Sequence, residues 1–305
     1  MDMLNNILYD LVTQSVPIIL AVLGGIFAHK VNVLNIGLEG MMLMGAFSSA
    51  LAVMITGSLW LGILIGIVCT VIIGVIFSVF AITLKSNFII TGLGINLFVS
   101  ALSSFVLKTM NVANINVTSV VNVASLKINI PFIQDIPILG PLLSGHTPIT
   151  YISFIMIFIA GVVMFKTRFG VYVRVIGENE EAAKSVGIKV NVIKYAAVLI
   201  GAVLCALAGA NLSVEGLALF TPDMTAGRGF IAIAAIFCGH GMPVRSTAYA
   251  LIFGLASSLA IHLVVVAGQI SGLLTMVPYL MIVVVLAFAS GIQAKKTHVR
   301  GFRLE

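Results

Sequence analysis

Polar side chains inside otherwise apolar stretches are the residues of this sequence best suited to chemistry, and they are few. Asn35 and Glu39 stand four residues apart at the start of one apolar run, and Asn96 lies within another. A carboxylate in hydrocarbon is costly unless it is paired, hydrated or near a helix N-terminus, so such a residue usually has a function. We therefore take Asn35, Glu39 and Asn96 as candidate residues of a path for a polar solute.

Each of these residues also has a structural interpretation. Glu39 would lie in the first turn of a half-helix capped by Asn35, because carboxylates stabilise the positive end of a helix. Asn96 would make a hydrogen bond between helices, which is the more common role of an amide in a membrane span. The functional and structural interpretations are compatible, and both stay open.

The remaining ionisable candidates are His262, which lies within the eighth apolar run, and three residues between the sixth and seventh runs. His262 has no acidic partner nearby in the sequence, which disfavours a proton relay. Glu215, Asp223 and Arg228 are expected on or near the outer face, where they either orient an external binding protein or are simply solvated.

Motifs for enzymatic chemistry are absent from the sequence. It contains no G-x-x-x-x-G-K-[ST] phosphate loop, no G-x-S-x-G elbow, no H-E-x-x-H and no C-x-x-C. The three cysteines each lie inside an apolar run without the paired spacing of a metal site. We expect neither an enzyme nor a resident cofactor or metal, and transport is the natural function.

The composition determines the fold class. Of the 305 residues 60% are hydrophobic and only 9% are charged, which excludes a water-soluble globule. A membrane-spanning helix needs about 20 apolar residues, and the long runs exclude a β-barrel of alternating ~10-residue segments. We predict an all-α polytopic integral membrane protein with about nine (8–10) transmembrane helices, over 11–28, 36–56, 59–83, 88–107, 149–165, 193–213, 229–240, 247–267 and 273–291. The seventh run is too short for a straight span, and we expect a re-entrant or broken segment there.

The basic residues predict the orientation in the membrane. Lys and Arg gather in cytoplasmic loops, so the net charge of +6 indicates topology and no nucleic-acid partner. With the loop 166–194 inside, only Lys108, Lys127 and Arg228 of the 16 basic residues lie outside. The chain 1–305 is thus expected to be one transmembrane domain with a cytoplasmic loop at 166–194, an extracellular loop at 108–148 and a cytoplasmic C-terminus.

The extracellular loop 108–148 contains a β-branched stretch over 111–130 and then three prolines. This pattern predicts an extended or hairpin-like cap with a partly buried end. Two functions are open for it, a lid over the helix bundle and a docking surface for a partner.

The loop 166–194 contains the signals of a short helix over about 178–188. Asn179 is a good N-cap, Glu180 and Glu181 fall in the first turn, and Gly187 is placed to end the helix. A free helix of two turns is marginal in water, so the membrane surface or a protein partner should stabilise it.

The string Glu181-Ala182-Ala183, followed by Gly187, resembles the coupling-loop motif of ABC importer permeases, which docks into a separate ATPase. With Gly177 and Asn179 ahead of it, the loop is similar to the branched-chain amino acid and simple-sugar permease superfamily. The segments 35–46, 91–97 and 224–232 resemble its nucleoside branch, whose partner is a basic-membrane-protein-like lipoprotein. The resemblance runs from about residue 17 to 292, but 239–243 reads Gly-His-Gly-Met-Pro where this branch often has an aromatic residue and Asn before Pro.

The resemblance implies a permease that imports nucleosides by alternating access across a bacterial cytoplasmic membrane. It implies three protein partners: an ABC ATPase subunit, a second homologous permease and an extracellular substrate-binding lipoprotein. ATPase coupling would be carried by Gly177, Asn179, Glu181, Ala182, Ala183 and Gly187. The alternative is an autonomous ion-coupled transporter or channel, for which Glu39 and His262 are nearly the only intramembrane candidates.

Overall fold

The protein is a bundle of long apolar helices. The computed structural model describes residues 2–131, 136, 138–267 and 276–287. In this part, seven helices are long and apolar enough to cross a membrane. They are α1 (Asp2–Lys30), α2 (Leu38–Thr56), α3 (Leu59–Ser78) with its π-helical continuation η1 (Val79–Thr83), α4 (Phe88–Thr109), α7 (Pro148–Lys166), α10 (Val190–Ala210) with its π-helical continuation η2 (Asn211–Leu217), and α12 (Pro243–Ala267).

Two further apolar helices of the described residues are shorter, namely α11 (Arg228–Cys238) and the helix Val277–Ala287. The polytopic all-α fold is thus confirmed, and the count of about nine spans is not. The seventh predicted run forms the short α11, as its length suggested, and the ninth run lies partly outside the described residues.

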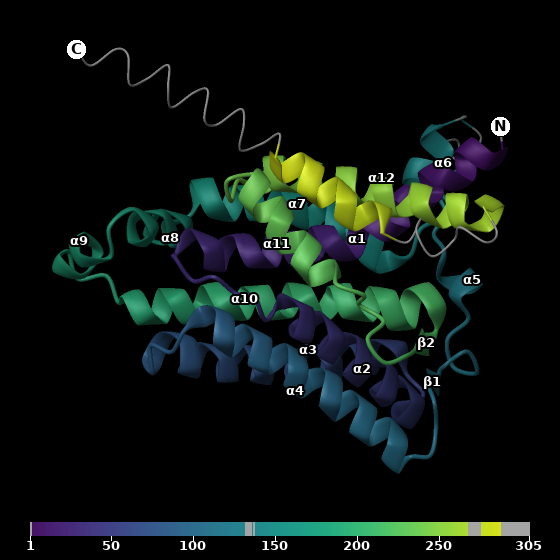
Figure 1. Ribbon diagram of the computed structural model, residues 1–305, viewed down its shortest axis with the longest axis horizontal. Helices are drawn as coiled ribbons and strands as arrows, with labels where there is room; N and C mark the ends of the chain where they lie inside the picture. Colours follow the sequence, from purple (N-terminus) through teal and green to yellow (C-terminus); the bar gives the residue numbers. More distant parts are fainter. Residues whose placement is uncertain (1, 132–135, 137, 268–275, 288–305) are drawn as a thin grey trace.

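The helices differ in how deeply the bundle buries them. The most apolar window of α1 is 83% buried and those of α2 and α10 are 72% buried, whereas that of α4 is only 22% buried. In Figure 1, α10 runs between a layer containing α1, α7, α11 and α12 and a layer containing α2, α3 and α4. The interior of the protein is therefore built around α1, α2 and α10.

Small residues allow these central helices to approach closely. A Cβ at Gly201 of α10 would lie 3.0 Å from the carbonyl oxygen of Gly24 in α1, and a Cβ at Gly209 would collide with the backbone of α2 at Met42. Such contacts between backbones are typical of membrane helix interfaces. Gly201 and Gly209 of α10 thus serve the close packing of the central helices.

The two ends of the bundle carry different structures (Figure 1). One end, called the strand end below, carries the short helices α5 (Val123–Leu126) and α6 (Leu139–Leu143). It also holds an antiparallel pair of short strands, β1 (Ile115–Asn116) and β2 (Leu219–Phe220). Within the loop 108–148, β1 pairs with a strand that follows α10, and Ile128 forms an isolated antiparallel bridge with His146. Ile115 and Val117 are buried, so the β-branched side chains serve this packing.

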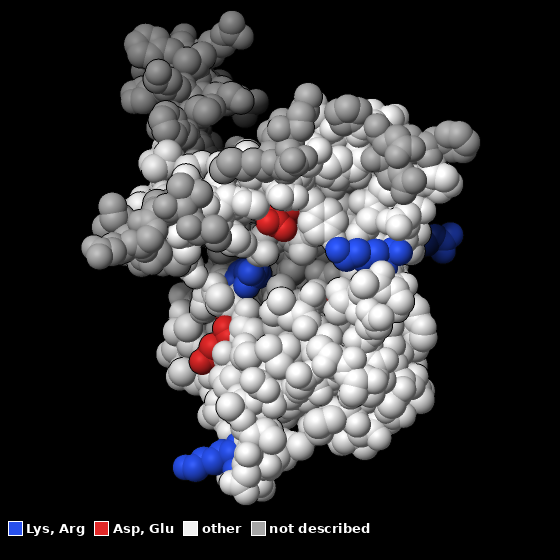
Figure 2. Space-filling view, turned by 90° about the vertical axis from the view of Figure 1, so that its right-hand side faces the viewer, with Lys and Arg blue, Asp and Glu red and all other residues white. Residues whose placement is uncertain are grey.

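Figure 2 views the strand end directly. Its lysine, arginine, aspartate and glutamate side chains are few and scattered over a largely uncharged surface.

The opposite end, called the α9 end, carries α8 (Arg168–Glu178) and α9 (Glu180–Ser185). Lys30 Nζ donates a hydrogen bond to the His240 carbonyl oxygen (2.9 Å), and Asn32 Nδ2 donates to that of Gly177 (2.9 Å). These contacts join the end of α1 to α8 and to the turn between α11 and α12. The placement of 166–194 and 108–148 at opposite ends agrees with the predicted alternation, while the predicted cytoplasmic C-terminus lies outside the described residues.

Candidate functional site

The starts of the long helix α2 and the short helix α11 meet inside the bundle. Residues 31–37 follow α1 without forming a helix, and the turn-rich segment 221–227 precedes α11. At 1.5 Å per residue the 11 residues of α11 extend about 16 Å, which is half of a ~30 Å hydrocarbon core. Because α11 leads to the α9 end, its first residues lie deep in the bundle, where irregular backbone is tolerated only when protein covers it or a cavity adjoins it.

Glu39 of α2 joins these two helix starts. Its Oε1 accepts the backbone N–H of Gly227 (2.8 Å), and its Oε2 accepts that of Gly229 (2.6 Å). A carboxylate is stabilising at a helix N-terminus because it accepts otherwise unpaired N–H groups. A Cβ at residue 229 would lie 2.6 Å from the Glu39 Cα, so this approach requires glycine. Glu39 lies in the first turn of α2, as predicted, but its carboxylate bonds to the start of α11 and not to that of its own helix.

Asn35 does not cap α2 as predicted. The helix begins at Leu38 with Gly37 in the N-cap position, and the buried Asn35 side chain accepts the Gly37 N–H (3.0 Å). The predicted N-cap position is two residues too early, because the Asn35 side chain closes the turn that precedes the helix.

Asn96 of α4 binds the same turn from the other side. Its Oδ1 accepts the Gly40 N–H (2.8 Å), and its Nδ2 donates to the Ile36 carbonyl oxygen (3.1 Å). The interhelical hydrogen bond expected of this amide is therefore present. A place of Asn35, Glu39 and Asn96 in a solute path stays a prediction, since the bonds described here connect backbone segments.

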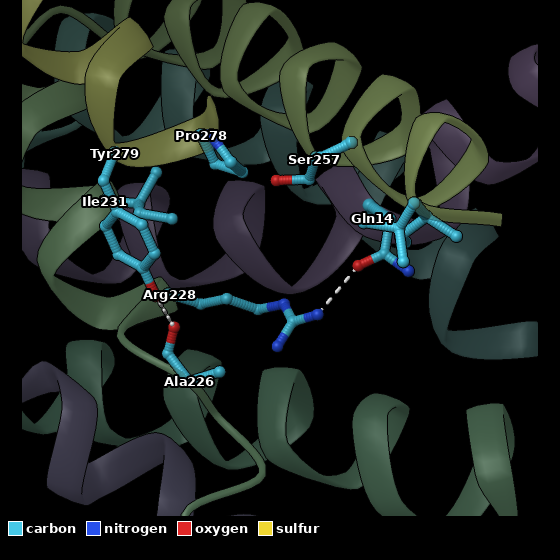
Figure 3. Close-up of a pocket in the computed structure, with 10 residues that line it drawn as sticks. Gln14, Ala226, Arg228, Ile231, Ser257, Pro278 and Tyr279 are labelled. Atoms are coloured by element: carbon cyan, nitrogen blue, oxygen red, sulfur yellow. Dashed lines mark hydrogen bonds between the residues drawn. The ribbon is translucent and has the colours of Figure 1, made fainter. Parts of the chain in front are cut away.

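A cavity of about 340 Å³ lies beside the start of α11 (Figure 3). It is lined by residues of α1, α11, α12 and the helix Val277–Ala287, and its polar side chains are Gln14, Arg228, Ser257 and Tyr279. Arg228 Nη2 donates to Gln14 Oε1 (2.8 Å), and Tyr279 Oη donates to the Ala226 carbonyl oxygen (2.7 Å). Sequence reasoning missed Gln14, Ser257 and Tyr279, although a glutamine inside the first apolar run was a usable signal.

Two of the charges expected on or near the outer face are not fully exposed. Glu215 is fully buried in η2, and its Oε2 accepts the Ile149 N–H (3.1 Å) in the first turn of α7. Arg228 is half-buried in the cavity wall. Neither is simply a solvated loop charge, because Glu215 bonds to α7 and Arg228 bonds to Gln14 of α1, while their place near the outer face stays a prediction. Asp223 is exposed and accepts a hydrogen bond from the Ser100 hydroxyl (2.7 Å).

His262 has an acidic partner that the sequence order conceals. Its Nε2 lies 2.9 Å from Asp10 Oδ2, which places a histidine–carboxylate pair between α12 and α1. No acidic residue lies near His262 along the chain, as expected, but the fold brings Asp10 of α1 beside it. Among the residues that the structure describes, no group of three or more His, Cys, Asp or Glu side chains is arranged to hold a metal ion.

The short helix of the 166–194 loop forms as its capping signals predict. Asn179 Oδ1 accepts the Ala182 N–H (3.0 Å), and Gly187 adopts a φ of 83° just beyond the helix. The helix covers Glu180–Ser185, somewhat less than predicted. A Cβ at Gly177 would collide with the Lys30 carbonyl oxygen, so the preceding turn lies tightly against the end of α1.

The exposed face of α9 carries a mixed acidic and apolar surface. Glu181 and Ala182 are exposed, Val186 is 72% exposed just after the helix, and Ala183 is buried. Glu180 accepts from Lys184 (2.8 Å) and from Lys194 of α10 (2.6 Å). These lysines, Lys184 first, hold the pKa of the Glu180 carboxyl below its ordinary value. The helix is thus tied to α10 while its outer face stays free.

Comparison with known proteins identifies the family. The family model "Branched-chain amino acid transport system / permease component" matches residues 7–286. The chain is 32% identical over 303 residues to the nucleoside ABC transporter permease protein NupC of Lactococcus lactis, covering 94% of this chain and 93% of that protein. It is 34% identical to the guanosine ABC transporter permease protein NupQ of Bacillus subtilis (80% and 78% covered). It is 30% identical to the putative glucose ABC transporter permease protein TsgC13 of Haloferax volcanii (82% and 75% covered).

The family match extends over all seven long helices and both short ones. Its members are membrane components that work with an ABC ATPase. This chain therefore belongs to the branched-chain amino acid transport system permease family, as a multi-pass membrane subunit of an ABC transporter.

Proposed function

We propose that this chain is the permease subunit of an ABC importer for nucleosides. Two relatives named for nucleosides or guanosine, at 32% and 34% identity, support this solute over glucose, for which the named relative is 30% identical. Separate ATPase subunits would drive alternating access. A second homologous permease and an extracellular substrate-binding lipoprotein would complete the complex in a bacterial cytoplasmic membrane.

The exposed position of α9 is the observation that carries the proposal. In Figure 1 this helix forms the tip of the molecule, away from the long helices. Its exposed Glu181 and Val186 offer one charge and one apolar anchor to a partner. A helix of six residues is too short to be stable alone, and the Asn179 cap and a docked ATPase would together fix it.

The contacts behind α9 provide a route for its motion into the bundle. Glu180 bonds to Lys194 at the start of α10, and Gly177 bonds to Asn32 in the segment that leads to α2. The first turn of α2 carries Glu39, which holds the start of α11. Through these hydrogen-bonded segments, a displacement of α9 by the ATPase would thus be transmitted to the contact between the first turns of α2 and α11.

Co-purification tests the coupling role directly. The tagged chain is extracted from its native membrane in mild detergent, and its partners are identified by mass spectrometry. A Glu181→Arg, Gly187→Arg variant is compared with a Ser119→Arg, Val120→Arg variant, which places two arginines on exposed residues of the strand end. We expect an ATPase and a second permease with the wild type and the control, and loss of the ATPase alone from the α9 variant.

The opposite result would remove the main support for an ATP-driven importer. Purification of the wild type without any ATPase, under conditions that preserve other ABC complexes, would contradict the proposal. Retention of the ATPase by the α9 variant would contradict the assignment of the docking helix. Uptake of labelled guanosine by the intact complex in proteoliposomes, with and without internal ATP, then tests the solute.

The Asp10–His262 pair supports a second candidate function, an autonomous ion-coupled transporter. A carboxylate and a histidine 2.9 Å apart are suited to carrying a proton. In that case a proton gradient without ATP would drive guanosine uptake, and Asp10→Asn would abolish it. Uptake that requires ATP and survives Asp10→Asn would exclude this function.

A further inference from the structure

We propose that the cavity of Figure 3 is the intramembrane binding station for the solute, and that it selects an uncharged nucleoside over its phosphorylated form. This inference rests on the proposed function and assigns it specific residues, namely Gln14, Arg228 and Tyr279. None of them is among the solute-path candidates that the sequence suggested.

The size and walls of the cavity suit a flat, partly apolar ring with polar edges. Its volume of about 340 Å³ falls in the ~300–1,000 Å³ range of small-molecule sites, which combine apolar walls with a few placed polar groups. Apolar side chains of α11 and α12, including Ile231 and Ile261, form much of the lining. Figure 3 shows Tyr279 and Gln14 on opposite sides of the Arg228 guanidinium.

The polar side chains that line the cavity have hydrogen-bond donors and acceptors that a ligand can use. Arg228 has five N–H groups, and within the described residues it donates to Gln14, Met224 and Thr225, which leaves two for a ligand. The Gln14 amide accepts from Arg228 through its oxygen, and its NH₂ group has no partner among the described residues.

The hydroxyl groups of the same wall supply acceptors. Tyr279 and Ser257 donate to the backbone oxygens of Ala226 and Phe253, respectively. Their own oxygen lone pairs can therefore accept hydrogen bonds from a ligand. A nucleobase presents donors and acceptors side by side, so it can use both sets.

The charge of the cavity favours a neutral solute. The Glu39 carboxylate bonds to the N–H groups of Gly227 and Gly229, on either side of Arg228, and it attracts the Arg228 guanidinium. The carboxylate of Glu39 and the guanidinium of Arg228 together contribute no net charge to this region. A phosphate group would bring uncompensated negative charge to the interior, which is strongly unfavourable, whereas a nucleoside brings none.

The protein offers a matched control for a cavity-filling test. A second cavity of about 290 Å³ between α1, α7 and α10 is lined by apolar side chains alone. Ala260 lines the polar cavity and Ala160 lines the apolar one, and each is 5% exposed. The variants Ala260→Phe and Ala160→Phe therefore place the same added side chain into a polar and an apolar cavity.

The first experiment measures ATP-dependent guanosine uptake and basal ATPase activity of the reconstituted complex. We expect Ala260→Phe to reduce uptake by at least about tenfold while the complex still assembles, and Ala160→Phe to transport and hydrolyse ATP like the wild type. Normal uptake by Ala260→Phe, or an equal loss in both variants, would overturn the cavity assignment. Absence of uptake by the wild type would instead contradict the proposed function.

The second experiment tests binding without relying on transport. The wild-type complex is photolabelled with 8-azidoadenosine, and labelled peptides are mapped by mass spectrometry. We expect label on α1, α11, α12 or the helix Val277–Ala287, which line the cavity, with protection by guanosine and no protection by guanosine monophosphate. Label confined to other helices would overturn the proposal that this cavity binds the solute. Equal protection by guanosine monophosphate would overturn the proposed selectivity for the uncharged nucleoside.

Discussion

The Glu39 carboxylate in α2 accepts the backbone N–H of Gly229 in α11 at 2.6 Å, although 190 positions separate the two residues. Each residue lies in the first turn of its helix, so the bond joins two helix beginnings inside the bundle. A transport cycle that separates α2 from α11 has to break this charge-assisted hydrogen bond. A transport cycle that preserves this bond moves the first turns of α2 and α11 together.

Replacing Glu39 by glutamine should destabilise the protein. The side-chain amide keeps one acceptor oxygen, but its NH₂ group would face a backbone N–H and leave that donor unpaired. Hydrogen bonds to charged groups contribute about 1.5–3 kcal/mol each, so we expect a clearly lower thermal unfolding midpoint in detergent. The control Asp223→Asn changes an exposed carboxylate in the same way and should leave the midpoint unchanged. Equal midpoints for both variants would contradict an anchoring role of Glu39.

The contact of α4 with the start of α2 depends on glycine at residue 92. A Cβ there would lie 2.8 Å from both the Gly37 nitrogen and the Ile36 Cβ, whereas a Cβ at Gly94 would have no atom within 4 Å. We expect Gly92→Ala to destabilise the protein by ~1–3 kcal/mol through overpacking. Gly94→Ala should be neutral or slightly stabilising because alanine favours a helix by ~1 kcal/mol. Thermal unfolding of the two variants decides the matter, and a reversed order would refute this helix contact.

The Asn179 cap should be required for efficient coupling. Asn179→Ala removes the acceptor for the Ala182 N–H and should weaken α9 by ~1 kcal/mol, while Asn179→Asp keeps the acceptor. Asn122→Ala removes an equivalent cap from α5 at the strand end. We expect reduced guanosine-stimulated ATPase activity only in Asn179→Ala. The same reduction in Asn122→Ala would show that the effect is not specific to α9.

The strand end should loosen at acidic pH because of His146. Its ring stacks on Tyr9 with centroids 4.7 Å apart, and its Nε2 hydrogen-bonds to the Pro141 carbonyl oxygen (3.0 Å). Burial is the main cause that lowers the pKa of His146 below its ordinary value near 6.5. The unfolded segment therefore binds a proton at a higher pH than the folded one, and stability falls as the pH drops below about 6.5.

Hydrogen exchange of residues 138–148 at pH 7.5 and 5.5, corrected for intrinsic rates, measures this loosening. We expect faster corrected exchange at the lower pH in the wild type. His146→Phe retains an aromatic ring for the stack but cannot titrate, so its corrected exchange should not depend on pH. A pH dependence that persists in His146→Phe would assign the effect to another group.

Local signals in the sequence were sufficient to predict α9. The cap joins Asn179 to Ala182, only three positions away, and Gly187 ends the turn with a backbone conformation that glycine adopts readily. Long apolar runs likewise determined the all-α membrane fold, since every span must satisfy its own backbone hydrogen bonds. The α9 cap and the apolar spans depend on residues that are close together in the chain, so they can be read from a single sequence.

Contacts between distant segments were decided by the tertiary structure alone. The pairing of Asp10 with His262, the burial of Glu215 against α7 and the strand pair β1–β2 all join parts that no sequence spacing relates. The polar cavity is of the same kind, because Gln14, Arg228 and Tyr279 come from three separate helices.

Hydropathy could not show which helices are interior. The windows of α1 and α4 have similar mean hydropathies of 2.0 and 1.8, yet 83% of the first and 22% of the second are buried. In a membrane, helices that face lipid and helices that face protein are equally apolar, so the sequence determined the spans while packing determined their places.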